Sequence, residues 1–241
     1  KRGWTTWLLA AVEPRVSALA PIVIDVLDME RHFPHQTEVW GAPSEEIRPY
    51  TDLNLHTVLG SPAGASLRAI VDPYSYRAAI TQPKLVVLAT NDAYFPLDSA
   101  NLYWDGLPGP KYLLYLPNEP HGIEHYGPFV RALRALHEST GGGAPLPSLA
   151  WEYRHAADAS TLCVRSLPGA RNLKLWQATS ADRDFRDETW QIIDERSASS
   201  GDFALPVPAA GYVAAFVAAD FRRGRRAFSL STNLVVLGAA G

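Results

Sequence analysis

The sequence is poor in cysteine, in charge of one sign and in long hydrophobic runs. Its single cysteine, Cys163, excludes an internal disulfide framework, and its place in a strand-like run predicts a buried, inert thiol. With 22 Lys and Arg against 25 Asp and Glu, the net charge is −3, which does not favour nucleic-acid binding. No stretch approaches the roughly 20 apolar residues that a membrane-spanning helix needs. We therefore expect neither a nucleic-acid partner nor a membrane span.

Motifs for cofactors and metals are also scarce. The glycines at 141–143 do not follow a strand pattern, so they do not predict a phosphate-binding loop. The spacing from His121 to His125 matches the His-x-x-Glu-His motif of some zinc hydrolases. However, Pro120 and Gly122 place His121 in a turn, and no later helix offers a third ligand. We predict no cofactor and no metal, and keep a zinc hydrolase as the less favoured alternative.

The region from Lys84 to His121 has the strongest pattern in the first half of the chain. Residues 84–90 and 111–116 are short apolar runs, typical of strands buried on both faces of a parallel sheet. Between them, residues 96–107 predict a helix with a proline near its start and a glycine just past its end. Residues 117–120 include two prolines, which predicts that the second strand ends before them.

An acidic residue and a histidine follow these two strands. Asp92 comes directly after the first strand, and His121 comes after the second. Because the carboxyl ends of parallel strands meet at one edge of a sheet, we expect the two side chains to lie close together. A carboxylate fixes the tautomer of an imidazole and stabilises the imidazolium that forms when the ring takes a proton. Two other interpretations stay open: Asp92 caps a helix while His121 fills a turn, or Asp98 is the acid.

The first 80 residues predict a helix, a strand and a helical insertion. Residues 4–12 are apolar and small, as in a buried helix, and residues 16–26 predict a strand over their second half. Residues 27–68 are rich in His, Pro, Trp and Glu and have no core-strand pattern. We interpret this segment as helical turns that roof a pocket, with Trp40 and Tyr50 as wall residues.

The last hundred residues change to a β pattern. A helical stripe over 129–139 is followed by a Gly- and Pro-rich linker at 141–148. Short runs with turn residues between them then occur at 149–153, 161–165, 172–178, 190–194, 202–205, 211–217, 227–232 and 235–237. This rhythm is typical of an antiparallel β-sandwich of immunoglobulin or fibronectin type over residues 149–241.

Motifs along the whole chain carry a resemblance to a known family. They are Lys1–Leu8, Pro21–Asp25, Val71–Tyr74, Thr90–Asp92, Pro117–Asn118 with His121, and Leu175–Ala178 with Asp184–Arg186. In this order they resemble the PhoPQ-activated pathogenicity-related proteins, which include the autocrine proliferation repressor-like proteins of eukaryotes.

The resemblance implies a serine hydrolase of the α/β-hydrolase superfamily. It places the nucleophilic serine immediately before Lys1, with the Lys1 N–H as an oxyanion donor. Asp92 would be the acid and His121 the base of a Ser-Asp-His triad. The family resemblance also implies export to the periplasm or the extracellular space.

Together these observations predict an α/β fold in two parts. Residues 1–140 would form the C-terminal half of an α/β-hydrolase domain with a mostly parallel sheet and a cap-like insertion at about 27–68, and residues 149–241 the β-sandwich. The predicted activity is acyl transfer from a small-molecule or peptide ester or amide. The alternative from another class is a non-catalytic secreted regulatory or binding protein on the same fold.

Overall fold

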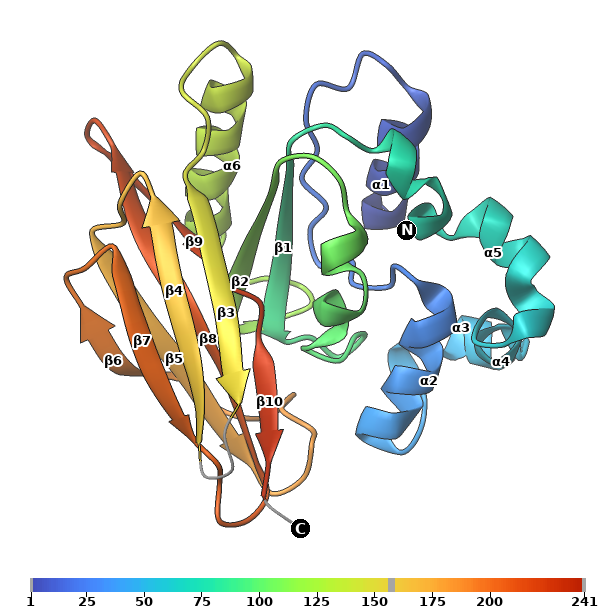
Figure 1. The fold of residues 1–241 in the computed structure, drawn as a ribbon. Coiled ribbons are helices and arrows are strands. Elements are labelled where there is room, and N and C mark those ends of the chain that lie inside the picture. Colours follow the sequence, from blue (N-terminus) through green and yellow to red (C-terminus); the bar gives the residue numbers. More distant parts are fainter. Residues whose placement is uncertain (1, 156–158, 240–241) are drawn as a thin grey trace.

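The fold is built on one large β-sheet, with the helices of the first 80 residues on one side and the last helix together with a small second sheet on the other (Figure 1). The computed structural model describes residues 2–155 and 159–239. Within those residues a seven-stranded sheet has the order β1-β2-β9-β8-β5-β6, with β10 also paired to β8, and a three-stranded sheet has the order β3-β4-β7.

The strands of the large sheet are β1 (Lys84–Asn91), β2 (Lys111–Pro120), β5 (Asn172–Ser180), β6 (Gln191–Arg196), β8 (Tyr212–Arg223), β9 (Arg226–Ser231) and β10 (Val235–Gly238). The small sheet has β3 (Ser148–His155), β4 (Ala159–Leu167) and β7 (Ser200–Pro206). The α-helices are α1 (Arg2–Val12), α2 (Met29–Trp40), α3 (Arg48–Thr51), α4 (Leu55–Leu59), α5 (Ala65–Val71) and α6 (Gly127–Thr140). The 3₁₀ turns are η1 (Glu45–Ile47), η2 (Pro62–Gly64), η3 (Pro73–Ala79), η4 (Ser99–Leu102) and η5 (Trp104–Gly106).

The prediction of a mostly parallel α/β-hydrolase sheet is wrong. Among the described strands, β1 and β2 form the one parallel pair, and the pairs β2–β9, β8–β9, β5–β8 and β5–β6 are antiparallel. The physical reason is that the C-terminal hairpin β8–β9, which was expected to belong to a separate sandwich, adds to the free edge of β2 in the antiparallel direction. The result is a β-rich fold with one mixed and one antiparallel sheet, which is compatible with sandwich features.

The expected strand within residues 16–26 is not formed. This segment runs alongside β1 in the parallel direction, but it contacts β1 through two isolated bridges, Leu19 to Lys84 and Ile22 to Val87. Val23 has a φ of 45°, which an extended strand does not tolerate. The segment therefore covers the outer edge of β1 without continuing the ladder.

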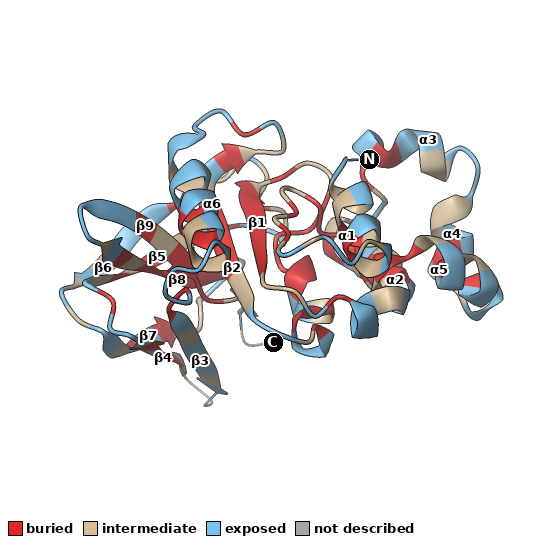
Figure 2. Ribbon diagram, turned by 90° about the horizontal axis from the view of Figure 1, so that it is seen from above, coloured by how far each residue is buried: buried red, intermediate tan, exposed pale blue. Residues whose placement is uncertain are grey.

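Both faces of the large sheet are buried. In β1, Val86 and Leu88 pack in the core that includes Trp7 of α1, whereas Leu85 and Val87 pack with Leu136 of α6. Figure 2 shows the buried β1 between α6 and α1. Strands that precede residues 141–148 and strands that follow them thus belong to one sheet and contribute to both cores. The division into two domains stays a prediction.

Two local predictions around the site are wrong. The helix expected over 96–107 is replaced by η4 and η5, because side chains of this segment bind distant parts of the chain. The Tyr103 hydroxyl donates to Asp25, and the Asn101 amide donates to the carbonyl of Leu234. The strand β2 also continues to Pro120 rather than ending before residue 117. A register shift opposite residues 89–91 accommodates this extension.

Most other elements were predicted correctly. The helix at 4–12 is confirmed by α1, the helix at 129–139 by α6, and the insertion at 27–68 by a run of short helices. Each short run predicted as a strand after residue 148 contributes to a strand. No described helix is long and apolar enough to cross a membrane.

Candidate active site

Asp92 and His121 form a hydrogen-bonded pair at the ends of the two parallel strands. The Nδ1 atom of His121 lies 2.8 Å from Oδ2 and 3.0 Å from Oδ1 of Asp92. The register of β1 and β2 brings these two chain segments together, since Asn91 pairs with Pro120. The Asp92 side chain is 6% exposed, whereas that of His121 is 33% exposed. The Asp92 carboxylate is therefore shielded from solvent, whereas the His121 imidazole remains accessible.

Further contacts orient both partners. Asp92 Oδ1 also accepts a hydrogen bond of 2.7 Å from the backbone N–H of Tyr94. The ring of Tyr94 lies against the His121 ring with 4.0 Å between centroids, and Phe95 lies at 6.0 Å. Because Nδ1 faces Asp92, Nε2 is on the opposite side of the ring, where no described residue makes a hydrogen bond to it. Such a histidine can exchange a proton with a bound molecule.

His121 lines a largely apolar cavity of about 400 Å³. The other lining residues are Arg2, Gly3, Trp4, Ile22, Val23, Ile24, Val26, His32, Phe33, Glu46, Ile47, Pro49, Tyr50, Leu59, Tyr94 and Phe95. The segment 46–59 contributes Tyr50, as expected for a roof. Trp40, the other predicted wall residue, is not part of the lining; its ring lies 4.3 Å from the Arg186 guanidinium instead.

A second hollow of about 430 Å³ is also lined by His121. It extends to Tyr126 and to Phe129 of α6, and the residues that it shares with the first cavity are Arg2, Gly3, Ile22, Val23 and His121. His121 therefore borders two hollows, each with room for part of a small molecule.

The N-terminal end of α1 points its first turn at both hollows. Arg2 and Gly3 line them, and the N-terminus of a helix favours negative charge because its N–H groups have no partners within the helix. A Cβ on Gly3 would lie 2.5 Å from Ile24 Cγ2, so the glycine allows α1 to approach this close. Lys1, the predicted oxyanion donor, lies outside the described residues, and its role stays a prediction.

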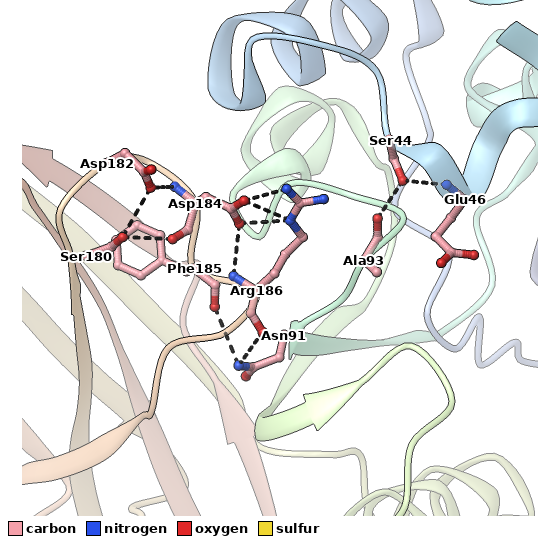
Figure 3. A network of polar contacts seen from close by, with 9 residues as sticks. All are labelled: Ser44, Glu46, Asn91, Ala93, Ser180, Asp182, Asp184, Phe185 and Arg186. Carbon is pink, nitrogen blue, oxygen red and sulfur yellow. Dashed lines mark hydrogen bonds and ion pairs between the residues drawn. The ribbon is translucent and has the colours of Figure 1, made fainter.

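The loop between β5 and β6 supports the acid end of the pair. The Asn91 side-chain amide donates to the carbonyl of Arg186 at 2.9 Å (Figure 3). It also donates to the carbonyl of Glu188 at 2.8 Å. Within the loop, Arg186 forms an ion pair with Asp184. On the other side, Ser44 Oγ donates to the carbonyl of Ala93 at 2.7 Å. The residues before and after Asp92 are thus held from two sides.

Asn118 supports the histidine end in the same way. Its side-chain amide donates to the Trp190 carbonyl at 3.0 Å, and its Oδ1 accepts from the Trp190 N–H at 2.7 Å. Its own N–H donates to Thr90 Oγ1 at 2.9 Å. Asn118 has a φ of 60°, a left-handed conformation that Asn tolerates better than most residues. This role was not predicted, and the one signal for it in the sequence is an amide residue between two prolines.

The rival acid and the rival metal ligand have other partners. Asp98 lies 2.6 Å from His35 Nε2 and 3.0 Å from Arg183 Nη2. Burial alone would raise the pKa of Asp98, but these two partners lower it. His125 lies 2.6 Å from Glu119 Oε1. Within the described part of the chain, no group of three or more His, Cys, Asp or Glu side chains is arranged to hold a metal ion.

Two buried ionisable groups, Asp25 and His32, lie near the cavity. Burial raises the pKa of Asp25 well above its ordinary value, opposed by the hydrogen bond from Tyr103. His32 lies against the edges of Phe33 and Phe95, and neither of its ring nitrogens has a hydrogen-bond partner in the described structure. Burial lowers the pKa of His32 to about 3, with the nearby His35 adding to this effect. His32 is therefore neutral at pH 7.

The neutral His32 makes stability depend on pH. Its pKa rises from about 3 in the folded chain to the ordinary 6.5 on unfolding, so between these values the unfolded chain binds more protons. Stability is thus lost as pH falls through this window, by about 1.4 kcal/mol per pH unit at most. We expect His32→Phe to lose about 2 kcal/mol less than the wild type between pH 6.5 and 4.5.

Urea unfolding at a series of pH values measures this difference. His137→Gln, at an exposed position on α6, is the matched control and should follow the wild type. An equal loss of stability in wild type and His32→Phe would contradict the assignment of a neutral His32.

Comparison with known proteins agrees with the motifs. Residues 1–186 match the model of a family described as PhoPQ-activated pathogenicity-related protein. The chain belongs to this family. The chain is also similar to a curated protein, Autocrine proliferation repressor protein A of Dictyostelium discoideum, with 29% identity over 246 residues. The match covers 92% of this chain and 50% of the relative, so the chain spans about half the length of the curated relative it matches.

Proposed function

We propose that this member of the PhoPQ-activated pathogenicity-related family carries the acid–base pair of a serine hydrolase that acts on esters or amides. The observation that supports the proposal is the contact of 2.8 Å between His121 and the buried Asp92, beside an apolar cavity. The proposal rests on this site and not on the fold, because function follows from the geometry of a site rather than from topology.

The chemistry assigned to the pair is proton transfer. His121 Nε2 takes the proton of a serine hydroxyl as its oxygen attacks the substrate carbonyl, and later returns a proton to the leaving group. Asp92 holds the ring by Nδ1 and stabilises the imidazolium. A water molecule then hydrolyses the acyl-enzyme, with His121 again as the base. The nucleophile is the serine expected immediately before Lys1, whose N–H would donate to the oxyanion.

The two hollows beside His121 suggest the kind of substrate. The cavity walls include Trp4, Phe33, Leu59 and Phe95, which favour an apolar acyl group. The second hollow, towards Tyr126 and Phe129, is assigned to the leaving group. We further propose that the natural protein is exported, as the resemblance implies.

A second candidate function is non-catalytic. The name of the Dictyostelium relative describes a repressor of proliferation. A secreted regulatory protein could use the same cavity to bind a ligand without turning it over.

Covalent labelling separates the two candidates. The natural full-length protein should react with a fluorophosphonate probe and hydrolyse p-nitrophenyl esters, whereas His121→Gln should do neither above background. His125→Gln is the matched control, since this histidine contacts Glu119 and should leave labelling unchanged. If the full-length protein neither labels nor turns over esters, the regulatory candidate replaces the hydrolase.

A further inference from the structure

A pocket lined by arginines lies between α6 and the β8–β9 hairpin, where α6 packs beside β9 (Figure 1). Its volume is about 240 Å³. The lining residues are Arg131, Arg134, Ala135 and Glu138 from α6, and Arg223, Arg225, Arg226, Ala227 and Phe228 from the hairpin. None of them lines the cavity at His121, so the pocket is a separate feature.

The pocket concentrates positive charge in an acidic protein. Five guanidinium groups and one carboxylate line it, although the whole chain has a net charge of −3. The helix side comes from positions 131, 134 and 138, which lie on one face of α6. Like charges gathered around one hollow repel each other, so an anion that enters it is favoured.

Three of the arginines are held in place. Arg134 Nε contacts Glu138 Oε1 at 3.1 Å, and Arg226 forms an ion pair with the same oxygen. Arg223 Nη2 donates to the carbonyls of Ala144 at 2.8 Å and Pro145 at 2.9 Å. The walls of the pocket are thus fixed before any ligand arrives.

The remaining two arginines have no such partners. Arg131 on α6 and Arg225 in the hairpin make no hydrogen bond or ion pair with any described residue. Glu138, the one carboxylate of the pocket, is already shared by two other arginines. Two guanidinium groups on opposite elements are therefore free to bind an added acceptor.

We propose that this pocket binds a phosphate- or sulfate-bearing anion with more than one negative charge. The planar guanidinium group donates two parallel hydrogen bonds to such an oxyanion, which is why arginine is favoured at phosphate sites. Arg131 and Arg225 bind the anion directly, from α6 and from the hairpin. Arg134, Arg223 and Arg226 add charge around it. The shared chemistry fits a free phosphate compound or the headgroup of an anionic lipid.

Calorimetric titration of the full chain with inorganic pyrophosphate, at constant ionic strength, tests the proposal. We expect saturable binding, weakened at least tenfold in the double variant Arg131→Gln/Arg225→Gln. The matched control is Arg165→Gln/Arg171→Gln, which removes the same charge from exposed positions outside the pocket. It should bind as the wild type does.

Co-sedimentation with vesicles identifies the source of the anion. Binding to phosphatidic acid vesicles but not phosphatidylcholine vesicles, lost in the pocket variant alone, supports a lipid headgroup. Binding of pyrophosphate without vesicle binding supports a free phosphate compound. Absence of saturable pyrophosphate binding would overturn the proposal, as would an equal loss in both double variants, which would mean that net charge alone attracts the anion.

Discussion

Replacing Asp92 with Asn in the full-length protein is expected to lower ester turnover by about 10⁴-fold while leaving the fold intact. The amide occupies the same space, but it can no longer accept two contacts from His121 Nδ1 as a carboxylate does. It also holds the imidazole in the wrong tautomer and cannot stabilise the imidazolium. The measurement is kcat and KM for a p-nitrophenyl ester, with circular dichroism to check folding.

Two matched variants make this result specific. Asp98→Asn removes the rival acid; since Asp98 contacts His35 and Arg183, it should lower the melting temperature yet keep turnover within about tenfold. Asp105→Asn, at an exposed position, should change neither quantity. Turnover that survives Asp92→Asn but disappears in Asp98→Asn would reassign the acid.

The meeting of Asp92 and His121 could be predicted because it depends on local signals. Two buried apolar runs predicted neighbouring parallel strands, and the register of such strands brings their ends together. The same local reasoning placed α1, α6 and the strands after residue 148. None of these predictions required knowledge of which distant segments pair.

The pairing of distant strands could not be predicted in the same way. The large sheet becomes continuous where β2 meets β9, through the registered pair Leu113 and Ser231 and a hydrogen bond of 3.1 Å from the Tyr115 N–H to Ser231 Oγ. Neither strand has a pattern that specifies this partner, because buried strands of mixed and parallel sheets have similar apolar runs. The mostly parallel sheet was therefore expected, and the mixed sheet was found.

The same long-range contacts explain why the support of the site was missed. Asn91 and Asn118 are ordinary turn residues in the sequence, yet both bind the segment 186–190 about 70 residues or more away. The strand-rich second half of the chain therefore supports the segments that carry Asp92 and His121. A region to which the sequence assigned no part in the site thus contributes to its support.

The two side-chain hydrogen bonds between Asn118 and Trp190 lead to the second large prediction. Asn118→Ala removes both side-chain hydrogen bonds and leaves the Trp190 N–H and carbonyl without these partners. It also places alanine, whose side chain makes no hydrogen bond, in the left-handed conformation at a φ of 60°. Together we expect a loss of about 2–4 kcal/mol in the free energy of unfolding, measured with urea.

Asn118→Gly separates the two causes, because glycine adopts the left-handed conformation freely. It should recover about 1 kcal/mol relative to Asn118→Ala, and the remaining loss belongs to the hydrogen bonds to Trp190. Both variants should lower kcat for ester hydrolysis more than they raise KM, since the acyl cavity does not include Asn118. Turnover should fall at every pH, as expected if His121 is displaced rather than changed in charge. Equal stability of Asn118→Ala and wild type would show that the hydrogen bonds to Trp190 contribute nothing to stability. A loss of stability with unchanged kcat would show that these hydrogen bonds do not position His121.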